Sequence, residues 1–319
     1  MELPPLLRTG VDCILADIPI AEIRKAAELL SGRYRRETRD GRLHLSERAA
    51  ATAYLATRLP ATYAAVRASL AAIAEIRPAW APRSLLDAGS GPGSVLWAAR
   101  DQWPSIERAS MIEASEAIRQ LGDTLARESG ACTRWISADI AHGLPALESA
   151  DLVTLSYVLG ELPPMAIDPL IERLWELSGE MLLVVEPGTP AGWQRVLLVR
   201  DRLIARGAHI VAPCPHAERC PLAAPDWCHF SRRVARSRTH RLAKEADVPW
   251  EDEKFIYLAA SHTPNDAPAA RVLARPRVAS GAIRLKLCGP DGQMEERLVT
   301  RRQGEVFKVA RRLNWGDRL

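Results

Sequence analysis

The stretch "SLLDAGSGPGSVLWAAR", residues 84–100, constrains the fold more than any other part of the chain. It consists of a short apolar run, a glycine-rich turn and the start of a helix. Asp87, Gly89, Gly91 and Gly93 stand where the apolar strand ends. Glycine permits positive φ angles and lets the backbone approach a ligand closely, while the next helix offers free N–H groups. Glycine spacing alone is weak evidence, because any strand-to-helix turn can use it.

Further apolar runs alternate with helical stretches downstream of this turn: "ASMIEAS", "ISADI", "ADLVTLSYVL", "MLLVVEPG", "GAHIVAP" and "FIYLAAS". Such alternation predicts a parallel sheet covered by helices on both faces. Glu113 ends the second strand, where a carboxylate can accept both hydroxyl groups of a ribose. Asp139 ends the third strand, where it can meet an adenine amino group.

The leading acid, the D-x-G-x-G-x-G form and the two later acids resemble class I S-adenosylmethionine-dependent methyltransferases more than NAD dehydrogenases. The resemblance implies a Rossmann-like α/β fold and bound S-adenosylmethionine. The alternative is that these residues form ordinary sheet-end turns and solvated acids. The predicted cofactor residues are Asp87, Gly89, Gly91, Gly93, Glu113 and Asp139.

The methyl-acceptor side is less informative. Methyltransferases of nucleic-acid amino groups usually show Asp or Asn, two prolines and an aromatic residue after the fourth strand, whereas this chain has "SYVLGELPPM". Its Pro163 and Pro164 lack both the preceding acid or amide and the aromatic residue. Cys214 is a poor candidate for the nucleophile of a cytosine-C5 methyltransferase, because it follows the wrong strand and has other thiols nearby. The sequence therefore identifies no catalytic residue.

Three regions are expected along the chain. Residues 1–80 are predicted to form an N-terminal helical region, since apolar residues recur there at three- and four-residue spacing. Residues 81–263 form the methyltransferase-like domain, with a Cys-rich insertion at 213–230. Residues 264–319 form a basic C-terminal β extension, in which Pro290-Asp291-Gly292 is predicted to turn a hairpin.

Charge and the N-terminal residues bear on partners and location. Residues 214–319 hold 20 Lys and Arg against 13 Asp and Glu, a net charge of +7, whereas the preceding part has a net charge of −3. The basic part is the one that could face a polyanion. Acidic Glu2, Asp12 and Asp17 differ from a basic presequence, so we expect a cytoplasmic protein. No apolar run reaches the length of about 18 residues that would suggest a membrane span.

Four cysteines suggest a metal site. Cys214, Cys220 and Cys228 lie within one polar stretch, and Cys288 ends the strand "AIRLKLC" just before the Pro-Asp-Gly turn. Proline beside two of them fits the rigid, irregular backbone of a ligand loop. Four thiolates suit either Zn²⁺ or an iron–sulfur cluster.

The other cysteines and the nearby histidines leave alternatives open. His216 and His229 allow a zinc site with three cysteines and one histidine. Six cysteines are too few and too uneven for a disulfide framework. Cys13 and Cys132 stand alone in apolar surroundings, and we expect both to be buried packing residues.

Several segments together resemble the methyltransferase-like protein seventeen family, the mitochondrial small-ribosomal-subunit assembly factors and their bacterial relatives. These are "APCPHAERCPL", "DWCHFSRR", "KFIYLAAS", "VVEPGTPAGW", "LLDAGSGPG" and "LNWGDRL", and the resemblance extends from about residue 30 to the end. It implies a protein, expected to be a monomer, that binds 16S-type rRNA on or near the small ribosomal subunit during assembly. It also implies a [4Fe–4S] cluster held by Cys214, Cys220, Cys228 and Cys288. Within the family, members either methylate RNA or only bind it.

The segment "FSRRVARSRTHRLAKE" is predicted to form one basic helix beside the metal loop. A solvated helix face is the simpler interpretation, but a second basic stretch in the tail favours phosphate contacts. The metal site would then clamp this helix and the tail hairpin into one RNA-facing surface. The rival hypotheses are a metal-stabilised ribosome-binding protein with an inactive methyltransferase fold, and a small-molecule methyltransferase with a zinc clip. The predicted RNA-binding residues are Arg232, Arg233, Arg236, Arg238, Arg241 and Lys244.

Overall fold

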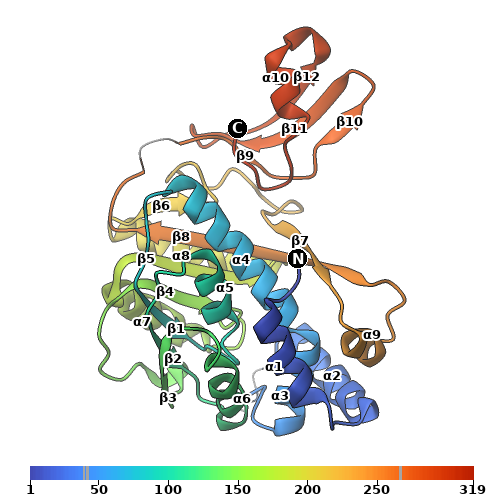
Figure 1. The fold of residues 1–319 in the computed structure, drawn as a ribbon. Coiled ribbons are helices and arrows are strands. Elements are labelled where there is room, and N and C mark those ends of the chain that lie inside the picture. The colour runs from blue at the N-terminus through green and yellow to red at the C-terminus, as the bar shows by residue number, and fades with distance from the viewer. Residues whose placement is uncertain (39, 41–42, 266–267) are drawn as a thin grey trace.

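A twisted sheet lies at the centre of the computed structural model, which describes residues 1–38, 40, 43–265 and 268–319 (Figure 1). The strand order is β3-β2-β1-β4-β5-β8-β6, and β7 pairs with β8 beside this path. Strands β1 to β5 pair in parallel, whereas β8 runs antiparallel to β5, β6 and β7. The bounds are β1 Ser84–Ala88, β2 Arg108–Ile112, β3 Cys132–Ile136, β4 Ala150–Ser156, β5 Ser178–Pro187, β6 His209–Ala212, β7 Phe230–Ala235 and β8 Trp250–Ser261.

Helices cover both faces of this sheet (Figure 1). Side chains of the central strands, such as Leu152, Val153 and Leu183, are fully buried because helices pack on either side. The arrangement is the class I S-adenosylmethionine-dependent methyltransferase fold that the sequence predicts. The helices that follow strands β1 to β5 are α5 Ser94–Gln102, α6 Glu116–Ala126, the short 3₁₀ helix η1 Ile140–His142, α7 Pro164–Leu177 and α8 Pro190–Ala205.

The N-terminal region is helical, with α1 Pro5–Leu15, α2 Ile20–Arg35, α3 Arg48–Thr57 and α4 Leu59–Ile76. The apolar stripe expected on α4 is buried, including Tyr63 and Leu70. Helix α2 packs beside α9, Arg238–Lys244, and the two ends are joined by a 2.8 Å ion pair between Arg24 and Glu245. The helical region therefore contacts an element that lies two hundred residues later in the chain.

A small second sheet follows, seen at the top of Figure 1, and it has its own apolar core around Ile283, Leu285 and Val299. The predicted hairpin is confirmed: β11 and β12 are antiparallel, with Cys288 opposite Met294. The sequence did not predict the helix α10 that closes this sheet. The elements are β9 Arg271–Val272, β10 Arg277–Ala279, β11 Ala282–Cys288, β12 Met294–Thr300, the 3₁₀ helix η2 Arg301–Gln303 and α10 Glu305–Ala310.

Two sequence-based expectations are wrong. Cys13 and Cys132 are exposed, because α1 buries a different face and β3 is the edge strand of the sheet. The basic segment is not one helix, since its first half forms strand β7 and only its second half forms α9. No helix in the described ranges is both long and apolar enough to cross a membrane.

Candidate functional site

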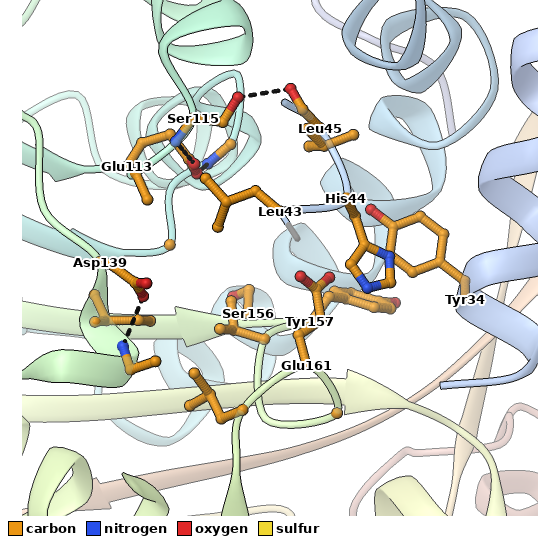
Figure 2. Close-up of a pocket in the computed structure, with 18 of the residues that line it drawn as sticks. Tyr34, Leu43, His44, Leu45, Glu113, Ser115, Asp139, Ser156, Tyr157 and Glu161 are labelled. Atoms are coloured by element: carbon orange, nitrogen blue, oxygen red, sulfur yellow. Dashed lines mark hydrogen bonds between the residues drawn. The ribbon is translucent and has the colours of Figure 1, made fainter. Parts of the chain in front are cut away.

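A cavity of about 480 Å³ opens at the carboxyl ends of β1, β2, β3 and β4 (Figure 2). Four of the predicted cofactor residues line it: Gly89, Gly91, Glu113 and Asp139. The sheet thus brings together residues from three strand ends, as parallel pairing requires. The cavity also reaches residues of the N-terminal helical region, which the sequence did not associate with it. Its size suits a cofactor-sized ligand.

The glycine loop presents its backbone to this cavity. Gly89 has a φ of +68°, and a Cβ atom there would stand 2.6 Å from Val158. At Gly91, with a φ of +52°, a Cβ atom would meet no atom of the described residues within 4 Å, so this backbone faces open space. Gly93 has a φ of +83° and caps the start of α5. Glycine is therefore required at the first position by packing and at all three by conformation.

The two predicted acids after β2 and β3 differ in how they are held. Glu113 accepts hydrogen bonds from the Gly91 amide at 2.9 Å and the Ser115 amide at 2.8 Å, which fixes its carboxylate beside the glycine loop. Burial raises the pKa of Glu113, and these two bonds oppose that effect. Asp139 is more exposed and caps η1 by accepting a 2.9 Å hydrogen bond from the Ala141 amide.

Asp87 and Gly93 stand behind the cavity and do not line it. The Asp87 carboxyl is fully buried, and its Oδ1 atom accepts a 2.7 Å hydrogen bond from the Thr154 hydroxyl. Its Oδ2 atom has no hydrogen-bond partner among the described residues. Burial raises the pKa of Asp87 to about 7. This acid therefore lies beneath the loop with one oxygen unsatisfied.

The end of β4 supplies cavity residues that the sequence analysis missed. Ser156 is buried, and its hydroxyl has no partner within the described ranges. Tyr157 has a φ of +61°, rare for a residue with a side chain, and its hydroxyl donates a 2.9 Å hydrogen bond to Glu253. Glu161 also lines the cavity, and burial raises its pKa to about 8. Polar residues directly after an apolar strand were the available signal.

The N-terminal region covers the other side of the cavity, where Tyr34 and His44 stack with ring centres 5.1 Å apart (Figure 2). An ion-pair chain holds this cover. Arg195 donates to Glu37 at 3.1 Å and to the buried Glu186 at 2.9 Å. No sequence pattern pointed to this cover, because its contacts join segments far apart in the chain.

The four predicted metal ligands do come together. Cys214, Cys220, Cys228 and Cys288 all line one small cavity of about 30 Å³ beside α8 and β8. Burial raises the pKa of every one of these thiols, that of Cys288 to about 12. In the part of the chain that the structure describes, no group of His, Cys, Asp and Glu has the arrangement of a metal-ion site. The metal site accordingly stays a prediction, supported by the convergence of the thiols.

The two histidines near these cysteines have different positions. His216 lines the same cavity, and its Nε2 atom lies 3.3 Å from the Cys288 Sγ atom. His229 instead stacks on Trp227, with ring centres 5.0 Å apart. Of the two, the structure places only His216 beside the thiols.

Several predicted RNA-binding residues make contacts within the protein. Arg233 pairs with Asp252 at 2.9 Å, and Arg236 donates to Glu251 at 3.2 Å. Arg241 donates to backbone oxygens of the loop that follows α9, and Lys244 bonds Ser31 on α2. Two of the six, Arg232 and Arg238, are exposed and make neither an ion pair nor a side-chain hydrogen bond within the described ranges.

Comparison with known proteins gives one family. The model of the mitochondrial small ribosomal subunit Rsm22 family matches residues 48–319. The human ribosome assembly protein METTL17, mitochondrial, is 32% identical over 291 residues, which cover 83% of this chain and 61% of that protein. The Rsm22-cox11 tandem protein 2, mitochondrial, of Schizosaccharomyces pombe is 23% identical over 319 residues, covering 83% and 42%. The chain thus spans about 61% and 42% of the length of these relatives.

Solved structures with a similar fold include two methyltransferases. An O-methyltransferase family protein from Burkholderia thailandensis has a TM-score of 0.47 and 12% identity, covering 77% of this chain and 73% of that one. Magnesium protoporphyrin IX methyltransferase from Synechocystis PCC 6803, with bound S-adenosylmethionine, has a TM-score of 0.42 and 16% identity, covering 73% and 90%.

Proposed function

Because the chain belongs to the mitochondrial small ribosomal subunit Rsm22 family, we propose that it binds S-adenosylmethionine and acts on the small ribosomal subunit. It does so either by methylating rRNA or as an assembly factor. The observation that supports cofactor binding is the cavity at the sheet edge. There the backbone of Gly91, which faces open space, lies beside the carboxylate of Glu113, which is fixed by hydrogen bonds. The ribosomal part of the proposal rests on the family and on the human relative, which is a ribosome assembly protein.

In the proposed complex, the glycine loop lies against the amino-acid part of the cofactor. Glu113 accepts the ribose hydroxyl groups, and Asp139 lies near the adenine. When bound, S-adenosylmethionine supplies an electrophilic methyl group on a sulfonium cation. The buried Asp87 carboxyl beneath the loop provides negative charge toward that cation.

Residues at the end of β4 favour a second ligand beside the cofactor. Buried polar groups are normally hydrogen-bonded, so the unsatisfied Ser156 hydroxyl indicates a position that a ligand would complete. Glu161 lies on the same wall and provides a carboxyl group for an acceptor. This observation supports methyl transfer over a protein whose methyltransferase fold is inactive, which is the second candidate function.

For the four cysteines we propose a [4Fe–4S] cluster, with Zn²⁺ as the alternative. The donor set fits either centre, since four thiols from two distant segments line one small cavity. Such a centre would tie the Cys-rich loop to β11 in the second sheet. It would thereby hold the tail hairpin and the basic arm, which consists of β7, α9 and the residues between them, as one rRNA-facing surface. A monomer in the cytoplasm remains part of the proposal.

Three experiments test these functions. Calorimetry with S-adenosylmethionine should give saturable heat, and absence of heat with the wild-type protein would reject the cofactor assignment. Transfer of a radioactive methyl group to small subunits from cells lacking this protein then separates the candidates, because an inactive assembly factor binds the subunits and transfers nothing. Purified without oxygen, the protein should be brown with iron and sulfide in equal amounts. A colourless protein with stoichiometric zinc would replace the cluster with Zn²⁺.

A further inference from the structure

Two arginines form part of the wall of the four-cysteine cavity. Arg200 on α8 is 2% exposed, and Arg271 on β9 is 3% exposed. Apart from these two, His216 and the thiols, the wall consists mainly of apolar residues such as Trp193 and Leu273. Arginine keeps its positive charge in proteins, and a buried cation without a counter-charge is costly. The placement of two such cations beside four thiols therefore requires an explanation.

Backbone carbonyl groups are the main partners of both arginines. Arg200 donates from Nη2 to the His216 oxygen at 2.9 Å and the Glu218 oxygen at 2.7 Å. Arg271 donates from Nε to the Pro213 oxygen at 3.0 Å and from Nη1 to the Gly316 oxygen at 2.7 Å. The two side chains thus hold both ends of the segment that carries the first two cysteines.

These carbonyl groups carry no net charge, so the two positive charges are poorly compensated. One carboxylate approaches Arg200, that of Asp201 at 3.4 Å, but its side chain is 71% exposed. In the described ranges, no carboxylate lies within ion-pair distance of Arg271. The Nε group of Arg200 is also buried without a hydrogen-bond partner among the described residues. Both the charge and the orphaned donor point to an anionic acceptor inside the cavity.

We propose that Arg200 and Arg271 are the counter-cations of the four-cysteine centre. Four thiolates around a cubane core of charge 2+, or around Zn²⁺, leave two negative charges, and two arginines balance them. This inference rests on the proposed metal site. The centre supplies the missing anion, and a ligand thiolate can accept from the Arg200 Nε group. The arginines act through the ligands and are positioning residues.

The two arginines belong to different parts of the molecule. Arg200 belongs to a helix packed on the large sheet, whereas Arg271 belongs to the small C-terminal sheet. Charge balance at the centre therefore adds a second link between these two parts, besides the ligation by Cys288. A bound centre with two negative charges attracts both arginines. Loss of the centre leaves two uncompensated cations between the large and the small sheet.

The test compares anaerobically purified wild-type protein with Arg200→Gln and Arg271→Gln, which remove one positive charge each. Arg200→Lys retains the charge and loses the fork of donors. Arg202→Gln is the matched control on the same helix, since Arg202 is exposed and pairs with Asp168 on α7. The readouts are iron content, visible spectrum, reduction potential and the rate of iron release to a chelator.

Reduction adds a negative charge to the centre, so removing a nearby cation should shift the reduction potential to a more negative value. Both Gln variants should show this shift and release iron roughly tenfold faster or more. Arg200→Lys should keep a potential close to that of the wild type, and Arg202→Gln should be unchanged in both measurements. If one Gln variant does not fold, the other and Arg200→Lys still test the charge.

Three outcomes would overturn the inference. Gln variants with full iron and the wild-type potential would exclude a counter-cation role. An equal shift in Arg200→Lys and Arg200→Gln would assign the effect to hydrogen bonding rather than to charge. Wild-type protein that binds no metal would refute the proposed site itself. This result can be told apart from the first outcome, in which the wild type binds metal and the Gln variants do not differ from it. If the metal is zinc, its release to a chelator replaces the potential as the readout.

Discussion

Asp87→Asn tests the interpretation of the glycine-loop region through stability, without any ligand. The Asp87 carboxyl is fully buried, and burial raises its pKa to about 7. The bond from Thr154 lowers this pKa and the charge of Glu113 raises it, but both effects are smaller than that of burial. In the unfolded chain the ordinary value of 3.8 applies. The folded protein therefore keeps a proton that the unfolded chain has already released.

This difference fixes the sign and the size of the effect. Because the folded state binds more protons, the free energy of unfolding must fall as the pH rises from about 4 to about 7, and it stays lowered above that range. About three pH units at roughly 1.4 kcal/mol each give about 4 kcal/mol. Asparagine has nearly the same shape, can accept from Thr154 and cannot ionise. Asp87→Asn should therefore gain stability relative to the wild type as the pH rises.

Urea denaturation at several pH values between 5 and 8 measures this gain. Between these limits the difference between Asp87→Asn and the wild type should grow by about 3 kcal/mol, since part of the effect is complete below pH 5. Asp123→Asn, which changes an exposed carboxylate on α6, serves as the control. A difference that is the same at every pH would refute the reasoning. Binding of the cationic cofactor should also release a proton below about pH 7, which calorimetry in two buffers detects.

Three further outcomes are expected. Glu113→Ala should weaken S-adenosylmethionine binding in calorimetry roughly 100-fold, because about 3 kcal/mol of charge-assisted hydrogen bonding is lost, whereas exposed Glu116→Ala should bind normally. Gly192→Ala should lower the free energy of unfolding by roughly 1–3 kcal/mol in urea, since its Cβ atom would stand 2.0 Å from the Pro187 oxygen; unchanged stability would contradict the packing. Replacing exposed Arg232 and Arg238 together by Ala should reduce the salt dependence of rRNA binding by roughly 1 to 2 in log–log slope, and an unaltered slope would place the RNA surface elsewhere.

The sheet and much of the edge that lines the cavity could be predicted from the sequence, because each depends on local pattern. Apolar runs mark the strands, and parallel pairing brings their carboxyl ends to one edge. For that reason Gly91, Glu113 and Asp139 could be assigned to one site before their geometry was known. The four cysteines converge as expected, and here too a local pattern is the reason. The Pro-Asp-Gly turn of the hairpin places Cys288 at the end of a strand.

Features that depend on distant partners could not be predicted. "FSRRVA" has buried residues at positions 230 and 234, a spacing that also suits a helix, and pairing with β8 decides in favour of a strand. Arg200 stands next to the exposed Asp201 in a helix and has no sequence mark of burial. Its buried position follows from the packing of a loop that comes later in the chain. The cover over the cavity depends in the same way on contacts between segments far apart.

This cover leads to a last prediction, because it joins the proposed cofactor cavity to the basic arm. Tyr34, which belongs to α2, lines the cavity. Helix α2 also contacts α9. Lys244 on α9 bonds Ser31 on α2, so a shift of one helix affects the other. A ligand that fills the cavity adds contacts to α2 and should reduce its local opening.

Hydrogen exchange measured by mass spectrometry follows this opening segment by segment. Saturating S-adenosylmethionine should slow amide exchange in the glycine loop, in α2 and in α9, while the hairpin of β11 and β12 keeps its rate. Lys244→Ala should retain the protection of α2 and weaken that of α9, because one side-chain contact between the helices is removed while the ion pair between Arg24 and Glu245 remains. Protection confined to the glycine loop would show that the helical cover and the basic arm respond independently of the cofactor. Protection that extends to α9 would mean that a ligand in the cavity reduces local opening around Arg238, on the surface proposed to bind rRNA.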